Sequence, residues 1–175
     1  LSILNWVALV KRDATNCHSK EERNSKLNNL CPLISQHSVD QKTIQKLSST
    51  GNHQECLLAC QQLLQNEPEN PLPWKYAGKS LLALGQFEDA QHPLIKAHQL
   101  AMSDPEIAKD IGNSFLNLGN KNAATQWYEK SLAINNNYAP AINNLANLKR
   151  QDGNNQEAVD LFKRAIQADP QLIQA

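Results

Sequence analysis

The sequence has little methionine, few aromatic residues and no excess of either charge. Of its 175 residues one is methionine, and tryptophan, tyrosine and phenylalanine occur three times each. Lysine and arginine together number 17, as do aspartate and glutamate, which leaves a formal net charge of zero. A neutral chain has no overall field that would attract nucleic acid or an anionic membrane, so we expect neither as a partner.

Long apolar runs are also missing. The mean hydropathy is -0.55, and no run approaches the roughly 18 apolar residues that a membrane-spanning helix needs. The apolar stretch from Leu1 to Val10 is followed, not preceded, by the basic pair Lys11 and Arg12, which is the reverse of a secretory signal. We therefore expect a soluble, cytoplasmic protein.

The sequence lacks the common motifs of catalysis. It contains no glycine-rich phosphate loop, no HExxH, no GxSxG and no paired CxxC. Two pairings of a nucleophile with a base are candidates for catalysis: Cys17 with His18, and Cys31 with His37. No third residue that would orient the base is evident in either case. We expect the chain not to be an enzyme and to need no cofactor.

Cysteine occurs four times, and two of the four have a helical spacing. A chain of 175 residues can build a core without disulfides, so we expect reduced thiols. Cys56 and Cys60 lie four residues apart with His53 nearby, which fits either a metal site or two small core residues on one helical face. We favour the second interpretation and expect no metal.

The glycines that are present recur at a fixed interval. Gly51, Gly85, Gly119 and Gly153 are 34 residues apart, and each is followed by asparagine or glutamine. A small residue stands five positions after each glycine: these are Cys56, Ala90, Ala124 and Ala158. A repeat of this length predicts a stack of similar supersecondary units.

Each unit has the apolar spacing of two helices, one on either side of the glycine. A glycine just after the first helix suits a left-handed C-terminal cap and allows the chain to reverse. Asn70 before Pro71, and Asp104 before Pro105, predict helix starts with a capping side chain and proline at the first helical position.

Two further expectations concern the local packing of these units. Ser38 with Gln41 resembles a capping box, which predicts that the first helix starts at this point. The small residues of the first helices should face those of the second, where near-antiparallel helices approach closely. The expected pairs are Gly78 with Ala90, Gly112 with Ala124 and Ala146 with Ala158.

With this distribution of tryptophan, glycine, alanine, aromatic residues and proline over residues 37–172, the sequence resembles the tetratricopeptide repeat family. The resemblance implies an all-α fold, a right-handed α-solenoid of antiparallel helix pairs. The expected domain covers residues 37–175, with units 37–70, 71–104, 105–138 and 139–172. Residues 1–36 form either an N-terminal arm or a degenerate repeat.

The resemblance also implies where a partner binds, because the first helices of such a stack line a concave groove. The groove positions of the family correspond to Lys75, Tyr76, Lys79, Lys109, Asp110, Asn113, Asn117, Asn143, Asn144, Asn147 and Arg150, together with Leu72, Leu82, Glu106 and Gln151. Asn144 matches the asparagine that forms a ladder in the repeat arms of protein glycosyltransferases, and amides of this kind can pair with any peptide backbone. The basic set with which some members grip a terminal carboxylate is not present here.

These observations predict a non-catalytic scaffold for protein–protein interaction that binds an extended peptide segment. An alternative is that the chain is the recognition arm of a larger enzyme, a glycosyltransferase, sulfotransferase or hydroxylase, whose catalytic domain lies outside it. The first residue is Leu1, and Ile173 to Ala175 continue the repeat register, so we expect further chain at both ends. We also expect possible self-association through an uncapped C-terminal repeat.

Overall fold

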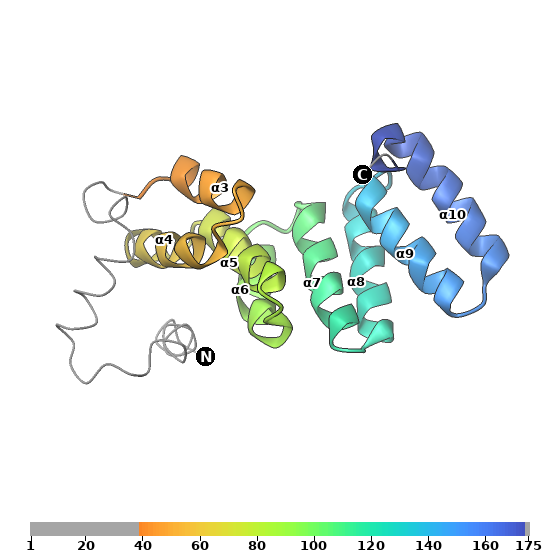
Figure 1. The fold of residues 1–175 in the computed structure, drawn as a ribbon, viewed down its shortest axis with the longest axis horizontal. Helices are drawn as coiled ribbons and strands as arrows, with labels where there is room; N and C mark the ends of the chain where they lie inside the picture. Colours follow the sequence, from red (N-terminus) through yellow and green to blue (C-terminus); the bar gives the residue numbers. More distant parts are fainter. Residues whose placement is uncertain (1–38, 174–175) are drawn as a thin grey trace.

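The computed structural model describes residues 39–173, and within this range the regular structure is entirely helical. The elements are α3 Gln41–Ser49, α4 His53–Asn66, α5 Pro71–Ala83, α6 Phe87–Leu100, α7 Pro105–Asn117, α8 Lys121–Ile134, α9 Ala139–Gln151, α10 Asn155–Ala168 and the 3-10 turn η2 Pro170–Ile173. The helices follow one another in pairs along the molecule, and each pair packs on the next (Figure 1). This arrangement is the predicted all-α solenoid. The expected arm 1–36 and the pairings of Cys17 with His18 and Cys31 with His37 lie outside the described residues.

The turns within the pairs are made by the periodic glycines. Their φ angles are +78° at Gly51, +74° at Gly85, +81° at Gly119 and +79° at Gly153, a region that other residues enter only with strain. At the second of these turns the backbone N–H of Gln86 donates to the carbonyl of Leu81 at 2.9 Å, which closes the end of α5. The predicted left-handed caps are thus confirmed.

The predicted helix starts at the two prolines are also confirmed. The Asn70 side chain accepts from the Leu72 N–H at 3.0 Å, and the Asp104 side chain accepts from the Glu106 N–H at 2.9 Å. The start of α3 is different from our prediction of a capping box between Ser38 and Gln41. This helix begins at Gln41, and Asp40 caps it by accepting from the Thr43 N–H at 2.8 Å, because a carboxylate one residue before the helix satisfies its free N–H groups directly.

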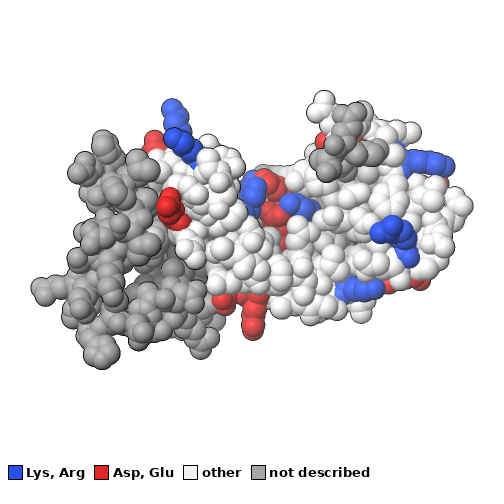
Figure 2. Space-filling model, in the orientation of Figure 1, with Lys and Arg blue, Asp and Glu red and all other residues white. Residues whose placement is uncertain are grey.

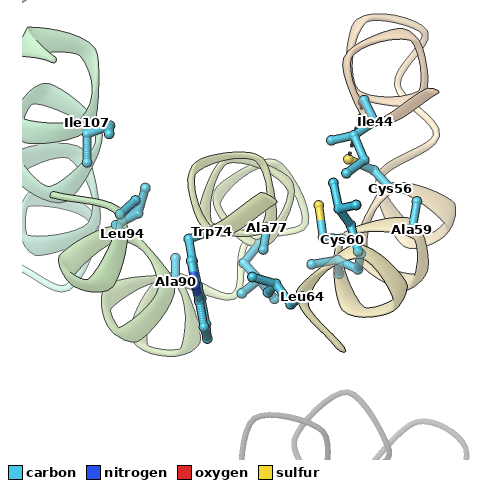
Figure 3. Packing of buried hydrophobic residues seen from close by; sticks show 14 of the residues in the cluster. Ile44, Cys56, Ala59, Cys60, Leu64, Trp74, Ala77, Ala90, Leu94 and Ile107 are labelled. Carbon is cyan, nitrogen blue, oxygen red and sulfur yellow. Dashed lines mark hydrogen bonds between the residues drawn. The ribbon is translucent and has the colours of Figure 1, made fainter. Parts of the chain in front are cut away.

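One apolar core cluster extends from α3 to α7, and a second, smaller cluster lies in α8 and α9. Trp74 is 1% exposed, and its ring lies among side chains of α4, α5 and α6, while its Nε1 donates to the carbonyl of Pro68 at 2.8 Å (Figure 3). Cys56 and Cys60 are both fully buried in the same cluster with free thiols, which agrees with the interpretation that they are small core residues.

The helices of a pair approach closely at glycine, and the side chain nearest to each of these glycines is a large one. A Cβ built on Gly78 would lie 2.4 Å from Cγ of Leu94, and one built on Gly112 would lie 2.5 Å from Cε1 of Tyr128. The large residue one turn further along the second helix therefore fills the space left by each glycine. The predicted facing of Gly78 with Ala90 did not include this closest contact, which lies one turn further along α6, because the axial offset of the two helices is set by the side chains that must fit between them.

Within residues 39–173, no helix combines the length and the apolar character that crossing a membrane would require.

Candidate binding groove

The first helices α5 and α7 enclose a hollow on one face of the stack. Its volume is about 330 Å³. Five of the predicted groove residues, Lys79, Leu82, Asp110, Asn113 and Asn117, line it together with Ala83 and Phe87. The hollow is therefore the place where the predicted residues of two successive units come together.

Ion pairs connect α5 to the start of α7 beside this hollow. Glu106 binds two lysines, with 2.5 Å to Nζ of Lys75 and 2.5 Å to Nζ of Lys79, and Lys75 also lies 2.7 Å from the carboxylate of Asp104. Figure 2 shows basic and acidic side chains clustered on the face where these two helices adjoin. Lys75 and Lys79 are thus already neutralised by carboxylates at the start of α7.

The two lysines change the acidity of Glu106. Burial alone would raise the pKa of its carboxyl, but the hydrogen bonds and charges of Lys75 and Lys79 outweigh burial and lower this pKa from 4.5 to about 2. A carboxyl whose pKa is lower in the folded than in the unfolded state stabilises the folded protein at pH values above its unfolded-state pKa. This contribution is lost as the pH falls toward about 2, the pKa of Glu106 in the folded state.

We therefore expect Glu106→Gln to lower the free energy of unfolding by about 1 to 2 kcal/mol at pH 7, less than the full pKa shift implies because the side chain is 30% exposed and screened by solvent. The difference between variant and parent should shrink as the pH is lowered from 5 to about 2. Denaturant unfolding at several pH values measures it. A difference that does not depend on pH would contradict the ion-pair explanation.

Asp110 lies deeper than the other groove residues. Its residue exposure is 3%, its Oδ1 lies 2.5 Å from Nζ of Lys109, and its Oδ2 has no hydrogen-bond partner among the described residues. Burial raises the pKa of this carboxyl, although the charge of Lys109 opposes the rise. The groove therefore contains a buried carboxylate oxygen whose hydrogen-bonding capacity is unused.

A network of amides joins the first helices of the next two units. Asn144 on α9 donates from Nδ2 to Oδ1 of Asn113 on α7 at 2.8 Å, and the hydroxyl of Tyr128 on α8 donates to the same oxygen at 2.9 Å. Burial raises the pKa of Tyr128 to about 12, so its hydroxyl remains protonated and able to donate. The network fixes the orientation of both asparagine side chains.

Models of known protein families recognise two stretches of this chain. The models are for the tetratricopeptide repeat, and they match residues 110–138 and 141–168. The chain contains tetratricopeptide repeats. The matched stretches contain Asp110, Asn113, Tyr128 and Asn144, so the amide network lies within recognised repeats.

Relatives of known structure show the same fold. A crystal structure of the MamA protein covers 75% of this repeat protein with a TM-score of 0.63 and 23% identity, and this chain covers 72% of it. YrrB, a tetratricopeptide repeat protein with an unusual peptide-binding site, has a TM-score of 0.62 and 16% identity over 83% of this chain and 74% of its own. These similarities support the solenoid fold.

One curated relative has a similar sequence. Anaphase-promoting complex subunit 6 of Arabidopsis thaliana is 25% identical over 100 residues, which is 54% of this chain. The matched part spans 18% of the length of that relative.

Other predicted groove residues lie on the same helices without reaching the hollow. On α9, Asn147 donates to the carbonyl of Asn143 at 3.1 Å, and Arg150 donates to Oδ1 of Asn147 at 3.2 Å. Tyr76 packs against the core with the ammonium of Lys79 5.5 Å from its ring centroid. The two asparagines and Arg150 thus interact within α9, whereas Tyr76 packs against the core.

Tyr128 and Phe87 were not predicted as groove residues, because both belong to second helices. Tyr128 occupies the position at which Leu94 and Phe162 stand in the neighbouring units. The signal in the sequence is its hydroxyl, since a tyrosine at a core position needs a hydrogen-bond partner. That partner is Asn113 on α7, which lies 15 residues earlier in the sequence. No rule of local spacing pairs these two positions.

Among residues 39–173, no group of three or more histidine, cysteine, aspartate and glutamate side chains is arranged to bind an ion.

Proposed function

We propose that this tetratricopeptide repeat protein is a non-catalytic scaffold that binds an extended peptide segment along α5, α7 and α9. The observation that carries the proposal is the pair of asparagines Asn113 and Asn144, which occupy successive first helices and are held by one mutual hydrogen bond. In the described part of the chain, Nδ2 of Asn113 and Oδ1 of Asn144 have no hydrogen bond. One donor and one acceptor are thus available on adjacent units.

An extended peptide presents the complementary groups. Each of its residues offers a carbonyl acceptor and, except in proline, an N–H donor, so a fixed amide donor and a fixed amide acceptor can pair with one segment regardless of its side chains. Pre-orientation by Tyr128 reduces the conformational entropy that the amides lose on binding. The fold similarity to YrrB, a repeat protein with a peptide-binding site, agrees with a role of this kind.

The proposal predicts that Asn113→Ala combined with Asn144→Ala weakens peptide binding. We expect a loss of about 0.5 to 1 kcal/mol for each hydrogen bond that is removed. The probe is a set of peptides selected from a random library with the parent protein, and isothermal titration calorimetry measures their affinities.

A matched control removes two exposed amides away from the groove, with Asn122→Ala and Asn155→Ala. We expect this control to bind the selected peptides like the parent. Circular dichroism establishes that both double variants are folded. If the groove variant binds as tightly as the control, the asparagines do not contact the peptide and the groove is not the binding site.

A further inference from the structure

The hollow beside Asp110 has an excess of free hydrogen-bond acceptors. The buried Oδ2 of Asp110 lacks a partner, and the side chain of Asn117 uses its Nδ2 to donate to the carbonyl of Asn113 at 2.8 Å, which leaves its Oδ1 free in the described part of the chain. A buried carboxylate oxygen without a partner is costly, so a ligand that brings a donor to this point gains the free energy of that missing bond.

The cationic donors near the hollow are already engaged. Nζ of Lys79 binds Glu106, and Nζ of Lys109 binds Oδ1 of Asp110. Lys75, Lys79 and Lys109 on one side balance Asp104, Glu106 and Asp110 on the other, three charges of each sign. The surroundings of the hollow therefore carry no net positive charge that would repel a cation.

Part of the wall of the hollow is apolar. Leu82 and Ala83 come from the end of α5, and Phe87 from the start of α6 contributes an aromatic ring. The volume of about 330 Å³ lies at the lower end of the range of small-ligand pockets. A suitable occupant has an apolar stem for the walls and a head that only donates hydrogen bonds.

Among peptide side chains, arginine combines these properties. Its guanidinium has five N–H donors and no acceptor, binds carboxylates in a planar geometry, and stacks on aromatic rings. We propose that the hollow holds an arginine side chain of the bound peptide, with Asp110 as its anchoring carboxylate and Phe87 as its stacking surface. This inference rests on the proposed peptide-binding function. It adds a requirement for an arginine in the peptide, whereas the asparagines of the groove contact only the peptide backbone.

Selection from a phage-displayed library of random dodecapeptides tests the assignment. The library is selected in parallel on the parent, on Asp110→Asn, and on Asp160→Asn as a control in which an exposed carboxylate of α10 is replaced. We expect arginine to be enriched at one register position by the parent and by the control, and we expect that enrichment to be lost with Asp110→Asn. The amide keeps the shape of the aspartate, so loss of enrichment reports its charge.

A double-mutant cycle gives the size of the effect. Replacing the selected arginine by leucine should weaken binding to the parent by about tenfold or more, as for a charge-assisted hydrogen bond, and to Asp110→Asn by less than about twofold. Two results would overturn the arginine assignment and leave the groove proposal standing. In the first, the selected peptides have no basic position. In the second, the arginine contributes equally to the affinity for the parent and for Asp110→Asn.

Failure of the groove itself has a different outcome. If no peptide is selected by the parent, the proposed function is wrong, and the hollow is then tested by titrating the parent with N-acetyl-arginine amide. Saturable changes in the side-chain amide resonances of Asn113 and Asn117, lost with Asp110→Asn, would support an arginine pocket on its own. No saturable change would overturn it.

Discussion

Trp74→Ala is expected to lower the free energy of unfolding by about 3 to 5 kcal/mol. The indole is 1% exposed and lies in the core between α4, α5 and α6, so its removal leaves a cavity that three helices cannot all move to fill. The variant also loses the hydrogen bond from Nε1 to the carbonyl of Pro68, and that carbonyl belongs to the connection between α4 and α5. Packing of one unit on the next therefore depends on this side chain.

Denaturant unfolding followed by circular dichroism measures this loss. A repeat stack is held together by contacts between neighbours, so the effect should be local as well as global. Amide hydrogen exchange should accelerate more in α4, α5 and α6 than in α9 and α10. Trp127→Ala is the matched control, because that indole is only partly buried and its replacement should cost less. Equal losses for the two variants would contradict the burial argument.

Much of the fold could be predicted from the sequence because its determinants are local. A helix that ends in a left-handed cap favours glycine at the residue with positive φ, as at Gly85, where φ is +74°. Because each unit has such a cap, glycine recurs in the sequence every 34 residues. Asn70 and Asp104 act within two residues of their own helix starts. Such signals depend on neighbours in sequence and can be recognised without knowledge of the tertiary structure.

The register between helices could not be predicted in the same way. The side chain nearest to Gly78 is that of Leu94, one turn beyond Ala90, because the offset of α5 along α6 is decided by how whole side chains interlock. The start of α3 was also misplaced. Ser38 and Asp40 are both good capping residues in the sequence, and in the structure the helix begins after Asp40, whose carboxylate accepts from the Thr43 N–H.

The candidate groove shows the same division. The repeat register places Asn113 and Asn144 on successive first helices, and the structure shows them hydrogen bonded to each other. Nothing in the register indicates that Asp110 is buried with one free oxygen, or that the hydroxyl of Tyr128 reaches Asn113 from a second helix. These contacts require the positions of three helices at once, so they become visible only in the assembled stack.

The contact between Gly112 and Tyr128 joins this groove to the core. A Cβ at residue 112 would lie 2.5 Å from Cε1 and 2.7 Å from Cδ1 of the tyrosine ring. The ring is fully buried, and its hydroxyl is bound to Asn113 at 2.9 Å, so it cannot withdraw without breaking the amide network. The gain of up to about 1 kcal/mol that a residue other than glycine brings to a helix is smaller than the cost of such overpacking.

Gly112→Val should therefore lower the free energy of unfolding by about 3 kcal/mol, and it should also weaken peptide binding because a displaced Tyr128 no longer orients Asn113. Denaturant unfolding measures the first effect and calorimetry with selected peptides the second. The control is the same substitution in a Tyr128→Ala background, where the ring is gone and valine should cost little or even stabilise the helix. An equal loss in both backgrounds would show that the glycine is needed for a reason other than the close approach of the ring.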